Sequence, residues 1–480
     1  MPANVVNKSV VLFLTCLAQF MVVLDIAIVN VALPSIQQDL EMRQSTLQWI
    51  VVAYGLFLGG FLLLGGRLGD LLGRRNIFLA GLTIFTIASL IAGLAHSSDL
   101  LIGARALQGF GAALVAPSAL AILATSFAEG SERNKALGIF GAVGGTSASI
   151  GVIASGLLTD GPGWRWIFFI NIPVGILLVA LAARFLPSDR PAERTGHYDA
   201  LGATTITSGL LLFIYGLNRG VDHGWSSAST VGLFVAAAVL LLSFIWVESR
   251  AASPLVPIAA LRNRVMAAAD AASFLLLGSF FAFIFLGTLL MQQQLGYSPT
   301  RTGLAWLTTS IPGFIFSGIT GAVLINRLGV RKLLIGGSTL LAVSAGWLAR
   351  VDADASFATD VMPAFLMAGA AIGLTAPTIQ IGALSGVKGH HLGLASGLVE
   401  TMREIGGAVA IALVSTVLVS AMSGSGEAAA VSMNGFHDAF YVIFAGAVAT
   451  VLVAGLAFPR STQPEPGWAI EGEELAAEAM

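Results

Sequence analysis

Long apolar runs separated by short polar breaks follow one another along most of the chain. A helix that crosses a bilayer needs about 20 mostly apolar residues, and fourteen runs are long enough for this. They cover residues 9–31, 46–66, 76–95, 99–121, 135–158, 165–186, 198–218, 228–248, 265–291, 302–326, 331–350, 358–381, 393–421 and 437–457. The pattern predicts an all-α membrane protein with fourteen transmembrane helices.

Basic residues in the polar breaks are distributed unevenly between the two sides of the membrane. With an even number of spans both termini lie on one side, and the loops of that side hold 17 of the 24 Lys and Arg residues. The loops of the opposite side hold five, which are Arg43, Arg165, Arg219, Arg301 and Arg350. Because cytoplasmic loops are enriched in Lys and Arg, we expect a multi-pass protein of the cell (inner) membrane with both termini in the cytoplasm.

The composition excludes several classes of protein. Of the 480 residues, 56% are hydrophobic and only 10% are charged, whereas a soluble domain carries about 25% charged residues. The net charge of −2 provides no basic excess for binding nucleic acid. The single cysteine, Cys16, excludes an intrachain disulfide, and no Cys/His spacing is typical of a metal site. We therefore expect neither a soluble enzyme nor a bound metal or cofactor.

Two weak internal repeats predict how the runs are grouped. Residues 109–118 and 369–378, in the fourth and twelfth runs, both carry Gly followed seven residues later by Ala-Pro-Ser/Thr. Residues 68–73 and 324–329, after the second and tenth runs, share Leu, Asp/Asn and Gly at the same spacing. An offset of eight runs fits two six-helix halves and two extra helices, and repeats of this kind occur in transporters with a substrate site between the halves. The predicted parts are an N-terminal six-helix bundle (1–190), two extra linker helices (191–260), a C-terminal six-helix bundle (261–458) and an acidic cytoplasmic tail (459–480).

Several short segments resemble the motifs of one transporter family. They are LDIAIVNVALP at 24–34, GRLGDLLGRR at 66–75, LIGARALQGFGAA at 101–113, WRWIFFINIPVG at 164–175, YDALGA at 198–203 and GLASGLVETMREIGG at 393–407. Together they resemble the fourteen-span drug:proton antiporters of the major facilitator superfamily. The resemblance implies the major facilitator fold and export of drugs or antibiotics, driven by the proton gradient and without a cofactor.

One segment departs from the pattern of this family. The fifth span of these antiporters usually carries a Gly-Pro pair and then a Gly-Gly pair, where this chain has Gly151-Val152 and Ser155-Gly156. Without the proline, the motif is weaker support for antiport. The case for transport itself is unaffected. The small residues between Gly138 and Gly156 still permit close helix packing against the other half.

Asp25 and Arg105 are the first candidates for proton coupling. A charge at the bilayer centre costs about 2.5–3.5 kcal/mol on insertion scales, so such residues are few and usually paired or functional. Each lies six residues from the outer end of its run, at a depth of about 9 Å, so the two can meet if their helices face each other. A transport cycle that separates them would let Asp25 take up a proton. The alternative is a static ion pair that fixes helix packing.

Glu400, Arg403 and Glu404 form a second intramembrane cluster. Spacings of three and four place Arg403 and Glu404 on the same helix face as Glu400. In the resemblance Arg403 fits the family pattern, whereas amides are more usual at the two glutamate positions. The cluster could share a proton or recognise a cationic substrate, or it could be a charge group solvated in a cytoplasmic cleft.

The segment after the second run contains candidates for a conformational latch, which are Gly66, Asp70, Gly73, Arg74 and Arg75. The resemblance implies that they stabilise the outward-open state by pairing with the opposite half. Asp70 could also face the N-terminus of a neighbouring helix, where a negative charge is favourable. The arginines alone fit the topology rule, and the glycines suit a tight turn in a loop.

Further polar and aromatic residues are candidates for a substrate cavity, because such cavities are mostly apolar with a few polar groups. They are Gln19, Tyr54, Gln108, Phe281, Phe285, Trp306 and Gln380, and they fit helix packing equally well. Asp270 lies near the end of its run, close to Arg262 and Arg264, and is expected to be an interfacial charge. His390 and His391 are expected to be solvated loop residues.

The sequence therefore favours a monomeric, proton-coupled secondary exporter of small hydrophobic molecules, including cationic ones. Two alternatives remain open. One is a carrier without antiport, which catalyses uniport or uptake of a metabolite. The other is a membrane sensor or scaffold that has lost transport. A membrane-embedded enzyme is disfavoured, because no nucleophile or metal constellation occurs at helical spacing.

Overall fold

The computed structural model describes residues 7–458 with gaps at 43, 48, 188–198, 252–262, 353–354, 386, 388–390, 424–429 and 432. The predicted acidic tail (459–480) and His390 lie outside the described residues. Within them the chain is helical except for two antiparallel strands of two residues each, β1 (Met422–Ser423) and β2 (Ala430–Val431). The predicted all-α architecture is confirmed at this level.

The N-terminal part of the chain forms long helices joined by short turns. They are α1 (Lys8–Asp39), α2 (Gln44–Leu47), α3 (Trp49–Leu72), α4 (Arg74–Gly93), α5 (Ser98–Ser126), α6 (Ser131–Asp160), α7 (Trp166–Phe169) and α8 (Asn171–Phe185). Side chains that accept hydrogen bonds from free N–H groups mark some of the starts. Asn7 accepts from the first turn of α1, and Ser97 from that of α5.

Two further helices precede the C-terminal part, α9 (Ala200–His223) and α10 (Ala228–Glu248). The C-terminal part consists of α12 (Arg264–Ala272), η1 (Ser273–Leu277), α13 (Gly278–Leu289), η2 (Leu290–Gln294), α14 (Pro299–Ile319), η3 (Thr320–Leu324), α15 (Ile325–Leu348), η4 (Phe357–Val361), α16 (Met362–Leu384), α17 (Leu392–Ser420) and α18 (Met433–Ala457). The η elements are π-helical turns: η1, η3 and η4 continue directly into an α-helix, and η2 ends α13.

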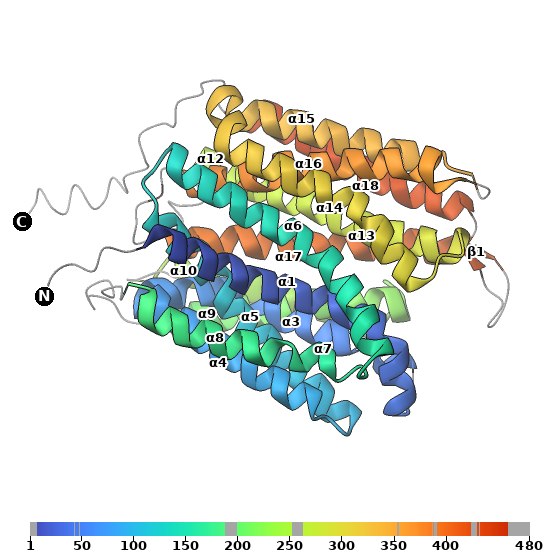
Figure 1. Ribbon diagram of the computed structural model, residues 1–480, viewed down its shortest axis with the longest axis horizontal. Helices are drawn as coiled ribbons and strands as arrows, with labels where there is room; N and C mark the ends of the chain where they lie inside the picture. Colours follow the sequence, from blue (N-terminus) through green and yellow to red (C-terminus); the bar gives the residue numbers. More distant parts are fainter. Residues whose placement is uncertain are drawn as a thin grey trace, which may run out of the picture.

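Twelve helical segments among the described residues are long and apolar enough to cross a membrane. One of them, Thr300–Leu348, has 49 residues and would be about 74 Å long if it were straight, more than twice the ~30 Å of the hydrocarbon core. It is broken at Gly329, where φ is 76° and ψ is 165°. Because α14 and α15 both pack against α16, the chain turns back at this glycine (Figure 1).

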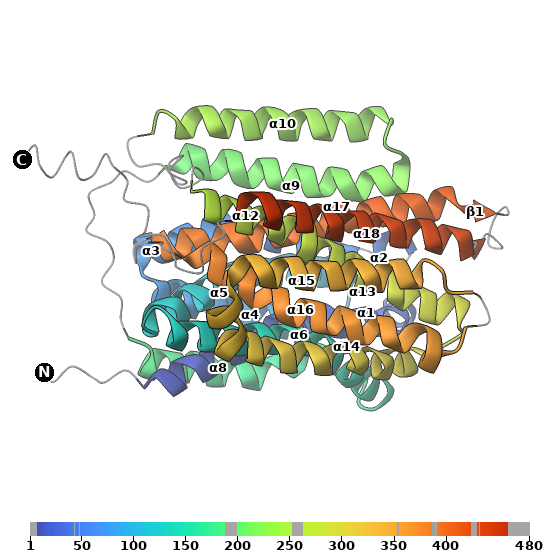
Figure 2. The same cartoon turned by 90° about the horizontal axis from the view of Figure 1, so that it is seen from above.

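The two extra helices lie at one edge of the molecule (Figure 2). α10 packs mainly on α9, and α9 packs on both α3 and α17. Gly59 and Gly60 of α3 leave room for Ile214 and Leu211 of α9. α9 and α10 form a helical hairpin. In the turn between them, Trp225 Nε1 donates a hydrogen bond of 3.0 Å to a hydroxyl of α17. The hairpin therefore touches the N-terminal and the C-terminal helices where these meet. The division into four parts stays a prediction.

The two sequence repeats occupy equivalent places in the structure. Gly73 and Gly329 both have positive φ, 93° and 76°, and both turn the chain between two helices. Gly109 of α5 lies so close to α3 that a Cβ there would be 2.3 Å from a carbonyl oxygen. Gly369 of α16 lies equally close to α14, with a corresponding distance of 2.1 Å. The same glycine therefore allows the same helix contact in each repeat.

The segment 65–75 is not the loop that the sequence predicts. α3 continues through Gly66 and Gly69, and α4 begins at Arg74, so Gly73 alone makes the turn. Gly66 lies at a helix contact instead, because a Cβ there would be 2.3 Å from the carbonyl oxygen of Gly393 in α17. The expectation of a glycine-rich turn is wrong for Gly66 and Gly69. Glycine is needed for close helix approach as well as for positive φ.

α6 places the small residues of the altered fifth-span motif against two partners. Gly138 lies against η3 and Gly156 against the start of α14, both in the C-terminal part. Gly151 and Ser155 face α1. The expected packing against the other half is confirmed at Gly138, where a Cβ would be 2.8 Å from the Cα of Gly321.

The packing of α5 on α3 predicts that Gly109→Ala destabilises the protein. The added methyl group would overlap the α3 backbone, and overpacking of this kind costs about 1–3 kcal/mol. Gly103→Ala on the same helix is the matched control, since no atom lies within 4 Å of its Cβ position and alanine favours the helix. Thermal unfolding in detergent should show a lower midpoint for Gly109→Ala alone. Equal midpoints for the two variants would contradict the close contact.

Candidate functional site

Asp25 of α1 is buried in the interior of the N-terminal helices and forms an ion pair with Arg105 of α5. Their exposed fractions are 0% and 1%. An unpaired charge at such a depth would cost several kcal/mol, so each side chain is tolerated because of the other. The expectation from sequence that these two residues meet is confirmed.

The other carboxylate oxygen of Asp25 is held by two amides. Asn171 Nδ2 donates to Oδ1 at 2.8 Å and Gln108 Nε2 at 3.2 Å. Gln108 also donates to Ser89 Oγ at 2.8 Å and accepts from Arg105 Nη1 at 2.9 Å. All five side chains are buried. Hydrogen bonds from α5 and α8 thus converge on one carboxylate of α1, and α4 joins the network through Ser89.

Arg105 is fixed on its remaining sides by backbone and aromatic groups. Its Nε donates to the carbonyl oxygen of Ile50 at 3.1 Å. Its guanidinium carbon lies 4.2 Å from the ring centroid of Tyr54 and 5.9 Å from that of Phe168, within the range of cation–π attraction. The Tyr54 hydroxyl in turn donates to the carbonyl oxygen of Val22 at 3.3 Å. The arginine therefore has a single position in the described state.

Sequence reasoning found part of this network. Gln108 and Tyr54 were expected in a substrate cavity, and the structure places both against the Asp25–Arg105 pair. Asn171 and Ser89 were not predicted. The sequence contains a feature that could have identified Asn171, because this residue is an amide within the apolar segment 164–175. No such feature distinguishes Ser89. A serine inside a membrane helix commonly donates a hydrogen bond to its own helix backbone, and this serine does so as well.

Arg403 of α17 forms the centre of the second cluster. It makes ion pairs with Glu400 and with Glu404, the latter at 2.9 Å between Nη2 and Oε1. Glu400 is 3% exposed, and Gln380 of α16 lies near its carboxylate. The side chains of Arg403 and Glu404 each remain 16% exposed. One arginine thus faces two carboxylates at the edge of the buried interior.

α3 lies between the two charged clusters. Its Tyr54 contacts Arg105, and Gly59 lies about one and a half turns further along the helix. A Cβ at Gly59 would be 3.7 Å from the Cβ of Glu404. One helix of the N-terminal part therefore contacts the buried charges of both parts of the chain.

Asp70, in the last turn of α3, contacts the start of α17. Its carboxylate accepts hydrogen bonds from the backbone N–H groups of Gly393 at 3.0 Å and Leu394 at 2.8 Å. Arg74 pairs with the same carboxylate at 2.8 Å, while Arg75 donates to a backbone carbonyl of α8. The expectation that Asp70 faces a helix N-terminus is confirmed, and this position favours a negative charge.

Asn326 takes the equivalent position in the second repeat. Its Oδ1 accepts from Asn134 at 3.1 Å and its Nδ2 lies 3.5 Å from Ser131 Oγ, both in the first turn of α6. Arg133 of the same turn donates to the carbonyl oxygen of Leu384 at the end of α16, at 2.9 Å. Contacts between the N-terminal and C-terminal helices therefore close the end of the molecule where both termini lie (Figure 1).

The remaining cavity candidates lie in other surroundings. Trp306 is stacked on Phe365 inside the C-terminal helices, with 4.5 Å between ring centroids. Phe281 packs against a glycine of α17, and Phe285 is partly buried in the core. Gln19 is buried in α1 beside α6. The structure does not bring these four side chains together.

Asp39 holds the opposite end of the N-terminal helices together. Its carboxylate accepts hydrogen bonds from Arg165 Nη1 at 2.7 Å and Trp164 Nε1 at 3.2 Å. Arg165 also donates to the carbonyl oxygen of Ala95 at 3.2 Å. The hydrogen bond from Arg165 lowers the pKa of Asp39 below its usual value. This pair is solvent-exposed, in contrast to the buried pair of Asp25.

Asp270 of α12 is not the interfacial charge that the sequence predicts. It is 7% exposed, its Oδ1 has no hydrogen-bond partner, and no ion pair in the described part of the chain includes it. Arg262 lies outside the described residues, and Arg264 donates to a carbonyl of α18. The packing of α12 against α16, α17 and α18 covers the carboxyl group. No set of three or more His, Cys, Asp or Glu side chains in the described ranges could hold a metal ion.

The isolation of Asp270 predicts that Asp270→Asn does not destabilise the protein. The amide keeps the volume of the side chain and removes a charge that is costly to bury without a partner. Thermal unfolding in detergent at pH 8 should give a midpoint at least as high as that of the wild type. Asp25→Asn is the comparison, and its midpoint should fall because it breaks a satisfied network. A lower midpoint for Asp270→Asn would show that the carboxylate has a favourable partner.

Residues 15–411 match the family model of the Major Facilitator Superfamily. The chain is 38% identical over 452 residues to Puromycin resistance protein pur8 of Streptomyces alboniger, an alignment that covers 92% of this chain and 88% of that protein. It is 36% identical over 463 residues to Cephamycin export protein CmcT of Amycolatopsis lactamdurans, covering 95% and 94%. Similarity at this level extends over nearly the whole chain.

The solved structures give the same answer for the fold. The human organic anion transporter MFSD10 (TETRAN) superposes with a TM-score of 0.69 at 13% identity, covering 93% of this chain and 99% of that chain. At this identity the likeness shows the fold alone. The family match, the relatives and the membrane helices show that this chain belongs to the Major Facilitator Superfamily, a multi-pass membrane transporter rather than an enzyme.

Proposed function

We propose that this protein is a proton-coupled exporter of small hydrophobic molecules, including cationic ones. Two of its relatives are a puromycin resistance protein and a cephamycin export protein, which supports export. The observation that carries proton coupling is the buried Asp25 with Arg105 as its ion-pair partner. A titratable side chain at this depth in a membrane protein is a functional candidate by default.

The arrangement of the pair suggests how a proton is taken up and released. Asp25 belongs to α1, Arg105 to α5 and Asn171 to α8, so a relative shift of these helices changes the carboxylate's partners. Separation from Arg105 leaves a buried carboxylate whose charge is costly, and this favours uptake of a proton. Re-formation of the pair favours its release.

The second cluster is proposed to recognise the cationic group of a substrate or to carry a second proton. Arg403 neutralises one of the two carboxylates Glu400 and Glu404, which leaves one formal negative charge. The partial exposure of Arg403 and Glu404 gives a ligand access to the cluster. Because α3 contacts both clusters, a change of charge at one can act on the position of the other.

The described state is closed at the end where the termini lie, through Asp70 and Asn326. Rocking of the two halves would open this end and close the other, and thereby expose a central site alternately to each side. The inward movement of one proton across 100 mV supplies about 2.3 kcal/mol per cycle.

The topology that we propose has fourteen spans. α6 crosses the membrane in addition to the twelve apolar segments, because it packs along α1 and α14, and Thr300–Leu348 counts as two spans. Both termini then lie on the side rich in Lys and Arg, which we assign to the cytoplasm of a cell-membrane protein. We propose that a single chain is the transporting unit, because its two halves together would form the central site.

A carrier without antiport is the second candidate. The altered fifth-span motif favours it, and that motif lies close to the coupling residue, since a Cβ at Gly151 would be 2.9 Å from the carbonyl oxygen of Leu24. A protonophore distinguishes the two functions, because it stops proton-driven efflux of a dye and leaves uniport intact.

The buried pair predicts that Asp25→Asn abolishes proton-coupled efflux while the protein remains in the membrane. The amide fills the same space and cannot exchange a proton. Uptake of ethidium into energised inverted vesicles and growth on puromycin in a pump-deficient host measure the loss. Substrate-induced proton movement should vanish as well.

Asp39→Asn is the matched control for this experiment. Asp39 lies on the same helix, is also paired with an arginine, and is exposed. Its replacement should leave efflux close to the wild-type rate. Normal efflux by Asp25→Asn would remove Asp25 from the mechanism.

The contact of Asp70 predicts that Asp70→Asn opens the end where the termini lie. A charge at a helix N-terminus contributes about 0.3–1 kcal/mol, so the open population should rise by up to about fivefold. Labelling of a cysteine introduced at buried Ser396, in a protein without Cys16, measures the opening. Glu132→Gln is the control, because this exposed glutamate on the same side pairs with Lys8 within the N-terminal part. An unchanged labelling rate in Asp70→Asn would exclude the latch.

A further inference from the structure

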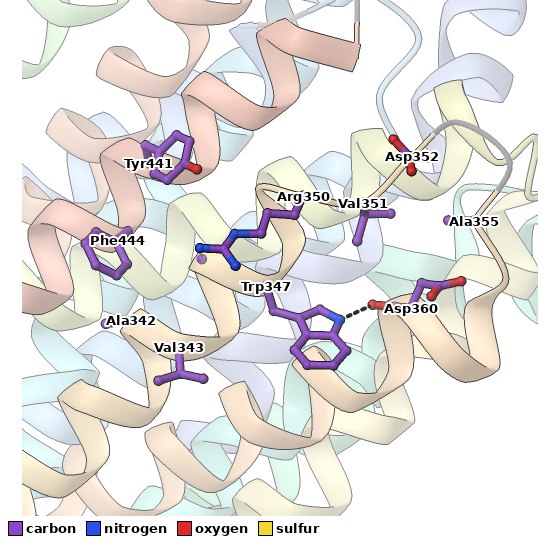
Figure 3. Close-up of a pocket in the computed structure, with 11 residues that line it drawn as sticks. Ala342, Val343, Trp347, Arg350, Val351, Asp352, Ala355, Asp360, Tyr441 and Phe444 are labelled. Atoms are coloured by element: carbon purple, nitrogen blue, oxygen red, sulfur yellow. Dashed lines mark hydrogen bonds between the residues drawn. The ribbon is translucent and has the colours of Figure 1, made fainter.

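A groove of about 750 Å³ lies on the outer flank of the C-terminal helices, between α15 and α18 (Figure 3). It is found at the end of the molecule away from the termini. Val343, Gly346 and Trp347 line it from α15, and Tyr441 and Phe444 line it from α18. None of these residues belongs to the charged clusters described above.

The apolar side chains of this groove are exposed to the surroundings of the helices. Val343 is 49% exposed and Tyr441 48%. On the flank of a membrane protein such surfaces are covered by lipid. Trp347 and Tyr441 are of the types enriched where the hydrocarbon meets the headgroups, and Trp347 Nε1 is fixed by a 2.8 Å hydrogen bond to the carbonyl oxygen of Asp360. The groove therefore lies at headgroup depth.

Two side chains of opposite charge, Arg350 and Asp352, lie at the rim of the groove. Arg350 extends over the groove towards Tyr441 and Phe444, while Asp352 lies on the other side of the rim (Figure 3). In the described part of the chain neither forms an ion pair, with the other or with any third residue. The nearby Asp360 is different, because its carboxylate accepts two hydrogen bonds from its own loop.

We propose that this groove binds a membrane phospholipid with a zwitterionic, ammonium-bearing headgroup. Arg350 and the Tyr441 hydroxyl would hold the phosphodiester, for which the planar guanidinium is well suited. Asp352 would hold the ammonium group. An acyl chain would lie along Val343, Gly346 and Phe444.

The shape and the charges of the groove favour this occupant. Its volume falls within the range of ligand sites, about 300–1,000 Å³. Gly346 keeps the floor open, since a Cβ there would already be 3.4 Å from the ring of Phe444. A free phosphate would satisfy Arg350 but would leave the apolar floor uncovered. A phospholipid covers the floor and neutralises both charges.

Native mass spectrometry of the full-length protein, delipidated in detergent, tests the site. The protein is titrated with phosphatidylethanolamine and, separately, with phosphatidylglycerol, which has no ammonium group. We expect Arg350→Gln to weaken the tightest binding of both lipids about tenfold, as for loss of a charge-assisted hydrogen bond. Asp352→Asn should weaken phosphatidylethanolamine alone. Gly346→Leu should block both lipids by filling the floor, and soluble glycerophosphoethanolamine should not bind.

Arg301→Gln is the matched control. Arg301 lies in the first turn of α14, and its guanidinium lies 3.7 Å from the ring centroid of Tyr297, so its loss should leave lipid binding unchanged. Unchanged binding in Arg350→Gln or Gly346→Leu, with normal gel-filtration profiles, would overturn the proposal. An equal effect of Asp352→Asn on both lipids would overturn the assignment of the headgroup, and tight binding of the soluble analogue would overturn the role of the acyl chain. None of these measurements depends on transport, so the proposed function can fail while this site stands.

Discussion

The ion pair between Asp25 and Arg105 constrains the whole N-terminal part of this protein. A charge in the interior of a membrane protein is tolerated only when a partner and hydrogen bonds replace the water that it has lost. Here five helices take part, because Arg105 also needs the carbonyl oxygen of Ile50 and the ring of Tyr54. The network is satisfied only in one arrangement of α1, α3, α4, α5 and α8. A change in charge at Asp25 therefore bears on the positions of helices rather than on one side chain.

Close helix contacts are what allow this constraint to reach the other half. α3 approaches α5 at Gly109 and α17 at Gly66, with distances that a methyl group would not permit. Because these contacts are backbone to backbone, α3 has little freedom to move without moving its neighbours. The same helix lies beside Arg105 and Glu404. It thus connects the charges of the two parts through one helix.

The sequence predicted the architecture well because the bilayer imposes strong rules on length, polarity and loop charge. Apolar runs of about 20 residues, paired repeats and intramembrane charges can all be recognised from the sequence alone. The meeting of Asp25 with Arg105 could be predicted because depth along a helix follows from residue number. The roles of Gly66 and Asp270 could not, since both depend on how a helix is rotated about its axis. The rotation of a helix is set by packing against its neighbours. When a helix is apolar on all sides, its sequence pattern does not indicate which face points inward.

The repeats also show where the two halves differ chemically. Asp70 and Asn326 occupy equivalent positions, and each contacts the first turn of a helix in the opposite part. The carboxylate interacts with the partial positive charge of the α17 N-terminus and accepts two backbone hydrogen bonds, whereas the amide makes neutral hydrogen bonds to side chains of α6. Charge-assisted bonds are about twice as strong as neutral ones. The carboxylate therefore strengthens closure on the α3–α17 side, which is also the side that the α9–α10 hairpin covers, while Arg133 adds one charge-assisted bond to Leu384 on the α6–α16 side.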